Sequence, residues 1–131
     1  VPYAIEVNPR PTASMELVER ASGRSIWLAH LAGCMGALSS LRAFSGDETA
    51  LAYGKAVLYA RQTVVLGDTA RWLADDDMRD IPASGERIAR GGPICTIFAH
   101  GRTSALCYAA LVRRARKRFA EVEGRMRRES A

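Results

Sequence analysis

The order of hydrophobic and polar residues at the start of the chain predicts a short strand. Over residues 3–8, apolar side chains alternate with polar or small ones, and this period of two is typical of a strand that is buried on one face only. Pro9 and Pro11 follow, and we expect them to end the strand because proline has no backbone N–H to donate to a sheet.

Two helices are predicted next. The hydroxyl of Thr12 or Ser14 is suited to cap the first helix, and Gly23 is suited to end it. Ser25 precedes a strongly apolar run and is expected to cap the second helix, which the glycines at 33–36 end. We expect a loop after this helix.

The middle of the chain favours strands and turns. Residues 56–66 are rich in Val, Leu, Tyr and Thr and predict one strand, or two strands with a break at residues 61–62. The acidic cluster 75–77 indicates a turn, and residues 81–93 contain a series of turn-forming residues. A further strand is predicted over residues 94–99.

The last part of the chain predicts one long helix, from Thr103 nearly to the end. Its apolar residues recur every three or four positions and predict a buried stripe: Tyr108, Leu111 or Val112, Ala115, Phe119, Val122 and Met126. The expected fold class is therefore α+β, with an N-terminal strand and two helices, a small central β-unit and a long C-terminal helix. A division into residues 1–36 and 37–131 and a single compact domain are both compatible with this length.

Composition narrows the class of protein. Of the 131 residues, 48% are hydrophobic, which is too many for a disordered chain. The longest apolar stretch, residues 26–38, is too short to cross a bilayer. Cys34, Cys95 and Cys107 are spaced too widely for a disulfide framework, so we expect buried, reduced thiols in a cytoplasmic protein. His30, on an apolar helix, is expected to be a core histidine.

The net charge of +5 belongs to one segment. Residues 113–128 contain eight of the basic residues, whereas the chain before residue 106 carries equal numbers of basic and acidic ones. A basic helix of this kind raises the alternative of a non-enzymatic binding or assembly domain that acts on nucleic acid or on an acidic protein partner. The run lacks interleaved aromatic residues for base stacking, so a solvated face or a docking surface is the favoured interpretation and nucleic acid is disfavoured.

The clearest candidate chemistry lies near the first residue. Glu6 and Asn8 are two positions apart on the predicted strand and therefore share a face. A carboxylate beside an amide carbonyl is an oxygen donor set that suits Mg²⁺. Arg10 can bind a phosphate with its planar guanidinium, and the dipole of the following helix favours an anion as well. These groups together point to phosphoryl transfer.

The run Ile5-Glu6-Val7-Asn8-Pro9-Arg10, followed by Thr12-Ala13-Ser14 and a helix, resembles the last strand of the ATP-grasp ligases. The likeness is greatest to the carbamoyl phosphate synthetase and biotin carboxylase-like branch. The resemblance implies that Glu6 and Asn8 are metal ligands and that Arg10 contacts the phosphate or the substrate. It also implies an enzyme that uses ATP and Mg²⁺ to activate a small-molecule carboxylate as an acyl phosphate, which an amine-type nucleophile then attacks.

The resemblance covers only the end of such an enzyme. The upstream lysines, the adenine-binding strand and a further acidic metal ligand of the superfamily have no counterpart in this sequence. We therefore expect the chain to be the C-terminal segment of a ligase, to need an N-terminal ATP-binding region as its partner, and to be inactive alone. Homo-oligomer formation stays open.

A second resemblance concerns residues 84–97, whose glycine spacing resembles half of a biotinyl/lipoyl-type barrel sandwich. The attachment lysine of that family, in a Met-Lys-Met hairpin, is absent, since the lysines of this chain are Lys55 and Lys117. The expectation is a structural β-unit without a swinging cofactor arm.

Overall fold

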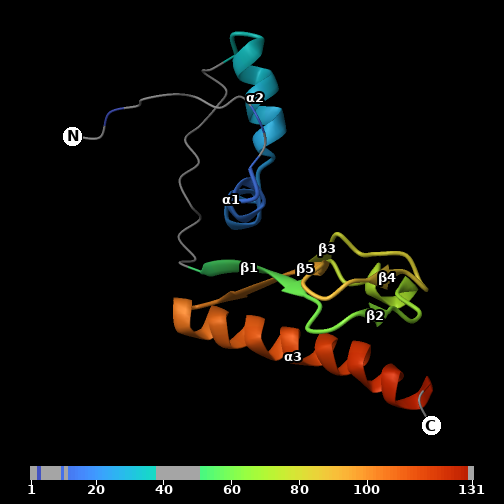
Figure 1. Cartoon of the computed structure of the whole chain (residues 1–131). Helices are drawn as coiled ribbons and strands as arrows, with labels where there is room; N and C mark the ends of the chain where they lie inside the picture. The colour runs from blue at the N-terminus through green and yellow to red at the C-terminus, as the bar shows by residue number, and fades with distance from the viewer. Residues whose placement is uncertain (1–2, 4–9, 11, 38–50, 130–131) are drawn as a thin grey trace. The chain divides into compact units, whose positions relative to one another are not determined.

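The computed structural model describes residues 3, 10, 12–37 and 51–129. The chain forms two compact units, which comprise residues 1–49 and residues 50–131 (Figure 1). Of the strand predicted over residues 3–8, the structure describes Tyr3, which is exposed. Residues 4–8 lie outside the described residues, so the strand stays a prediction.

The N-terminal unit contains two helices, α1 (Met15–Ser22) and α2 (Ile26–Cys34). Gly23 ends α1 as predicted: its φ of 64° is left-handed, and its N–H donates to the carbonyl of Glu19. The Ser25 hydroxyl accepts from the N–H of Leu28 at 3.4 Å, so the predicted cap of α2 is confirmed. The hydroxyl of Ser14 makes no capping hydrogen bond, because the Ser14 backbone is itself helical and the hydroxyl lies 2.8 Å from that of Thr12.

The C-terminal unit is built on two long antiparallel strands, β1 (Ala52–Tyr59) and β5 (Pro93–Gly101). The short strand β3 (Met78–Arg79) pairs with the other edge of β5, which gives the strand order β1-β5-β3. A separate ladder joins β2 (Val64–Val65) to β4 (Arg87–Ile88). Of the two alternatives for residues 56–66, the structure has two strands with a break at residues 61–62, because β1 ends before the break and β2 begins after it.

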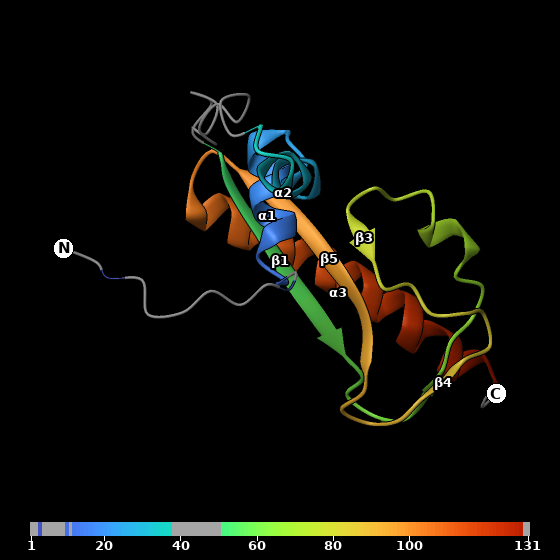
Figure 2. The same cartoon turned by 90° about the horizontal axis from the view of Figure 1, so that it is seen from above.

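One long helix, α3 (Ser104–Glu129), covers one face of the β1–β5 pair (Figures 1 and 2). Glycines in the two strands let it approach closely. A Cβ at Gly101 would lie 2.6 Å from the backbone nitrogen of Cys107, and one at Gly54 would lie 2.9 Å from the Leu111 side chain. Together with the helices of the N-terminal unit, this sheet and helix confirm the α+β class.

At the start of α3, the row of residues that packs on the sheet differs from the predicted row. Cys107 is buried, whereas Tyr108 is 69% exposed, so the prediction that Tyr108 belongs to the buried stripe is wrong. The rest of the buried row follows from Cys107 at helical spacing and joins the core, with Leu111, Ala115, Phe119 and Val122. Residues 107 and 111 are apolar, and so are residues 108 and 112. The first pair is the one that packs against Gly54, where a Cβ would lie 2.9 Å from both side chains.

Two further expectations are corrected within the N-terminal unit. Cys34 is exposed, unlike the buried Cys95 and Cys107, and His30 is exposed as well, with its Nε2 3.7 Å from the sulfur of Cys34. Both lie on α2, a helix without buried residues.

Within the described part of the chain, no helix has the length and apolar character needed to cross a membrane.

Candidate functional site

The structure describes one of the three residues predicted to carry the chemistry. Arg10 lies in a bend and is exposed. Glu6 and Asn8 lie outside the described residues, so their convergence on a metal ion stays a prediction. The helix expected after the motif is present, with α1 beginning at Met15 directly after exposed residues 12–14.

A cluster of charged residues lies in the C-terminal unit. It forms where the turn at residues 75–77, which we call the acidic turn, meets α3. Asp75 accepts one hydrogen bond from Arg114, at 2.6 Å, and one from Arg118, at 2.8 Å, each to a different carboxylate oxygen. Arg114 also lies 3.5 Å from the carboxylate of Asp77. The acidic turn thus binds the C-terminal helix through two arginines, which the interpretation of the basic run as a solvated face did not foresee.

Arg118 continues this cluster to a second carboxylate. Its Nη1 donates to Oε2 of Glu121 at 2.8 Å, and the same oxygen accepts from the indole N–H of Trp72 at 2.9 Å. The Arg118 guanidinium also lies 5.6 Å from the centre of the Trp72 ring. Because Trp72 belongs to the short 3-10 helix η2 (Ala70–Trp72), these bonds tie η2 to α3.

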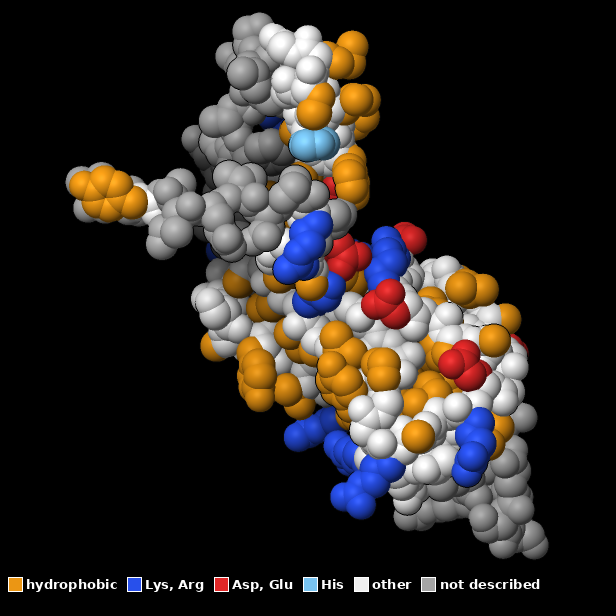
Figure 3. All heavy atoms as spheres, turned by 45° about the horizontal axis from the view of Figure 1, so that its top comes forward, with side chains coloured by type: hydrophobic (Ala, Val, Ile, Leu, Met, Phe, Trp, Pro, Cys, Tyr) orange, Lys and Arg blue, Asp and Glu red, His pale blue; other side chains and the backbone are white. Residues whose placement is uncertain are grey.

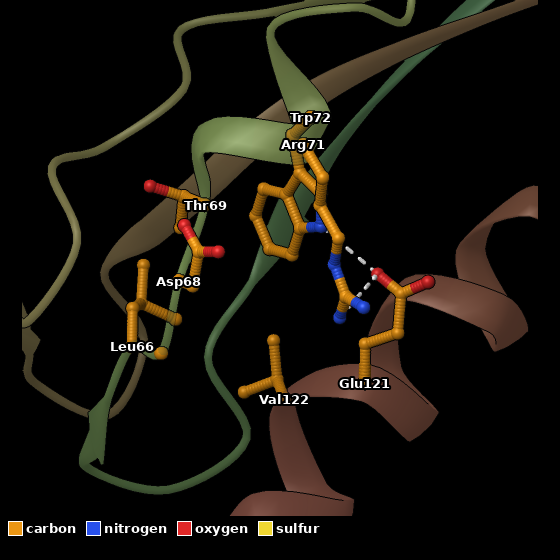
Figure 4. A pocket seen from close by; sticks show the side chains of 8 residues that line it. Leu66, Asp68, Thr69, Arg71, Trp72, Glu121 and Val122 are labelled. Carbon is orange, nitrogen blue, oxygen red and sulfur yellow. Dashed lines mark hydrogen bonds and ion pairs between the residues drawn. The ribbon is translucent and has the colours of Figure 1, made fainter.

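A pocket of about 170 Å³ lies beside this cluster (Figure 4). Its polar groups already have partners: Asp68 accepts from the N–H of Ala70, the Thr69 hydroxyl donates to the carbonyl of Pro82, and Arg71 lies 3.8 Å from Glu121. Pockets that hold a cofactor or a drug-sized ligand are usually larger, about 300–1,000 Å³. The pocket is therefore best explained as part of the packing between η2 and α3, not as a substrate site.

The two carboxyl groups of the cluster are favoured in their charged form. Burial acts to raise the pKa of Asp75, but the hydrogen bonds from Arg114, from the N–H of Asp77 and from Arg118 outweigh it, so the pKa lies below its usual value. Burial likewise acts to raise the pKa of Glu121, and the bonds from Arg118 and Trp72 lower it overall. Lowered pKa values in the folded state link folding to pH.

This linkage predicts a loss of stability in acid. Because the pKa of Asp75 is lower in the folded chain, its contribution is fully present above the unfolded pKa of about 3.9 and is lost as the pH falls through the folded value. Asp75→Asn should lower the free energy of unfolding at pH 7. Between about pH 5 and 3, the free energy of unfolding should then decrease less in the variant than in the parent protein. Urea unfolding across this pH range measures both effects. Asp76→Asn, at the neighbouring exposed carboxylate, is the matched control, and equal acid dependence in the two variants would contradict the role of Asp75.

A sequence signal for the cluster does exist. Arg114 and Arg118 are four residues apart and flank the apolar row of α3. An arginine at such a position can pack its aliphatic stem on the apolar surface while its guanidinium reaches a neighbouring element. The position of their partners depends on the tertiary fold.

Comparison of the chain with protein-family models, with curated proteins and with solved structures finds no match.

Proposed function

We propose that this chain is the C-terminal segment of an ATP- and Mg²⁺-dependent ligase of the ATP-grasp superfamily. The enzyme would activate a small-molecule carboxylate as an acyl phosphate for attack by an amine-type nucleophile. The observation that carries the proposal is the run Glu6-Val7-Asn8-Pro9-Arg10 followed by Thr12-Ala13-Ser14 and a helix.

The donor chemistry of the motif fits the proposed group. Glu6 supplies a charged oxygen ligand and Asn8 a neutral one, and hard oxygen donors are those that Mg²⁺ prefers. When bound, Mg²⁺ neutralises charge on the phosphate groups of ATP. Arg10 would orient and stabilise the transferring phosphoryl group through its guanidinium N–H groups.

Two features of the N-terminal unit support the proposal. Arg10 is exposed, and α1 begins shortly after it, as the motif requires. In addition, α2 exposes Trp27, Leu28 and Leu31, whose side chains are 60%, 69% and 55% accessible. Large apolar side chains grouped on one helix are typical of a surface that another part of a protein covers, and the N-terminal ATP-binding region would be that part.

The test uses the complete protein that the gene encodes. Incubated with ATP, Mg²⁺, a panel of small carboxylic acids and hydroxylamine, it should form a hydroxamate and ADP only when a carboxylate and Mg²⁺ are both present. Hydroxylamine traps the acyl phosphate by attack at its carbonyl carbon, with release of phosphate, and so replaces the unknown nucleophile. A reading frame that starts a few codons before Val1, with no ATP-binding region, would contradict the proposal.

A further inference from the structure

The basic residues of α3 fall into two groups. Arg114 and Arg118 face the acidic turn and are paired. Arg113, Arg116 and Lys117 are exposed, and in the described part of the chain no hydrogen bond or ion pair involves their side chains. In Figure 3, Lys and Arg side chains project together along one edge of the C-terminal unit, beside hydrophobic side chains.

A shallow apolar groove adjoins the exposed group. Tyr108, Ala109, Val112, Arg113 and Arg116 line it, and its volume is about 460 Å³. Positions 108, 112 and 116 follow one another at a spacing of four and therefore share one face of the helix, with 109 and 113 beside them. This face, which we call the outer groove, is opposite the row that packs on β1 and β5.

The chemistry of the outer groove limits what can occupy it. Tyr108 offers a large apolar ring that is 69% exposed, so an occupant must supply apolar side chains. The unpaired guanidinium groups require anionic groups next to them, and arginine binds carboxylates with two parallel hydrogen bonds. An amphipathic helix with acidic residues beside its apolar stripe meets both requirements.

Two other occupants fit less well. A nucleic acid is bound by several cations along its backbone, and a single strand also by aromatic rings that stack on its bases. Here Arg113, Arg116 and Lys117 span about 6 Å of helix axis beside one tyrosine. A second copy of the chain would bring the same arginines together across a two-fold axis, where like charges repel.

We propose that the outer groove of α3 docks an acidic amphipathic helix of a protein partner. Apolar side chains of the partner pack between Tyr108 and Val112, and its carboxylates pair with Arg113 and Arg116. The inner face of α3 is held against the strands at Gly54 and Gly101, so the surface is ordered before binding and little entropy is lost there. This proposal does not depend on the ligase proposal.

The test titrates the isotopically labelled chain of 131 residues with a synthetic helical peptide that carries leucines at positions i and i+4 flanked by glutamates. Amide shifts in the NMR spectrum should change for residues 108–116. The double variant R113E/R116E should weaken binding by about tenfold or more, and Tyr108→Ser should weaken it while leaving its salt dependence intact. Arg90→Glu, at an exposed arginine in the turn before Gly91, is the matched control and should bind as the parent does.

The competing occupants give different results. No binding of the glutamate peptide at about 1 mM, or equal binding of a peptide with lysine in place of glutamate, would overturn the proposal. Tighter binding of single-stranded DNA, with a steep loss of affinity in salt, would assign the groove to nucleic acid instead. Concentration-dependent dimers in sedimentation that Tyr108→Ser abolishes would assign it to a second copy.

Discussion

Glu6→Gln is expected to lower kcat/KM for Mg²⁺-ATP-dependent hydroxamate formation by about 10²-fold or more in the complete protein. The substitution keeps the size of the side chain and removes the negative charge of a proposed metal ligand. A neutral amide binds Mg²⁺ more weakly than a carboxylate does, so the charge on the phosphate groups is less well neutralised in the transition state.

Glu16→Gln is the matched control for this result. Glu16 lies in the first turn of α1 and carries the same change of charge and shape close to the motif. Its replacement should cost the helix about 0.5 kcal/mol of dipole stabilisation and leave turnover unchanged. The two variants are compared by steady-state assay across a Mg²⁺ series, with circular dichroism to verify folding. Turnover of folded Glu6→Gln at the parent rate and Mg²⁺ requirement would remove Glu6 from the metal site.

Local signals in the sequence predicted most of the elements. Gly23 and Ser25 mark the end of α1 and the start of α2 because a left-handed residue and a capping hydroxyl act over a few residues. The same holds for β5, a short apolar run that follows a series of turn-forming residues, and for α3, where the helical period extends over many positions. These signals need no knowledge of what packs against each element.

What the sequence did not predict depends on contacts between distant residues. Both Cys107 and Tyr108 begin an apolar row on α3, and the row of Cys107 is the one that lies close to Gly54 and Gly101 in the strands. The pairing of Asp75 with Arg118 joins residues 43 positions apart. No local pattern reports such a distance, so the acidic turn and the basic run could be identified from sequence but not assigned to each other.

The two candidate binding sites differ in what the sequence contributes to them. The predicted metal set of Glu6 and Asn8 rests on residue types, on strand spacing and on the resemblance of the motif to the ATP-grasp ligases, and among these residues and Arg10 the structure describes Arg10 alone. The outer groove, in contrast, could not be found from sequence. It requires knowing that Arg114 and Arg118 are paired inward while Arg113 and Arg116 remain exposed.

Arg118→Ala is expected to lower the free energy of unfolding of the C-terminal unit by about 2–4 kcal/mol. Arg118 is 11% exposed and binds Asp75 and Glu121 at 2.8 Å each. Its removal leaves two carboxylates close to the core with fewer partners, and it also removes the stem and guanidinium that lie over Trp72. The partial exposure of Asp75 and Glu121, at 24% and 20%, lets water replace part of the lost interaction.

Arg116→Ala tests whether this cost comes from the contacts of Arg118 and not from the loss of an arginine in α3. Arg116 lies two residues earlier on the same helix and is exposed, so its removal should change stability by about 0.5 kcal/mol or less. Urea unfolding of the full chain, followed by Trp fluorescence and circular dichroism, measures both variants. Arg118→Met should recover part of the loss because its side chain restores packing on Trp72 without the charge. Equal stability of the Arg118→Ala and Arg116→Ala proteins would show that the arginine cluster does not hold α3 to the acidic turn.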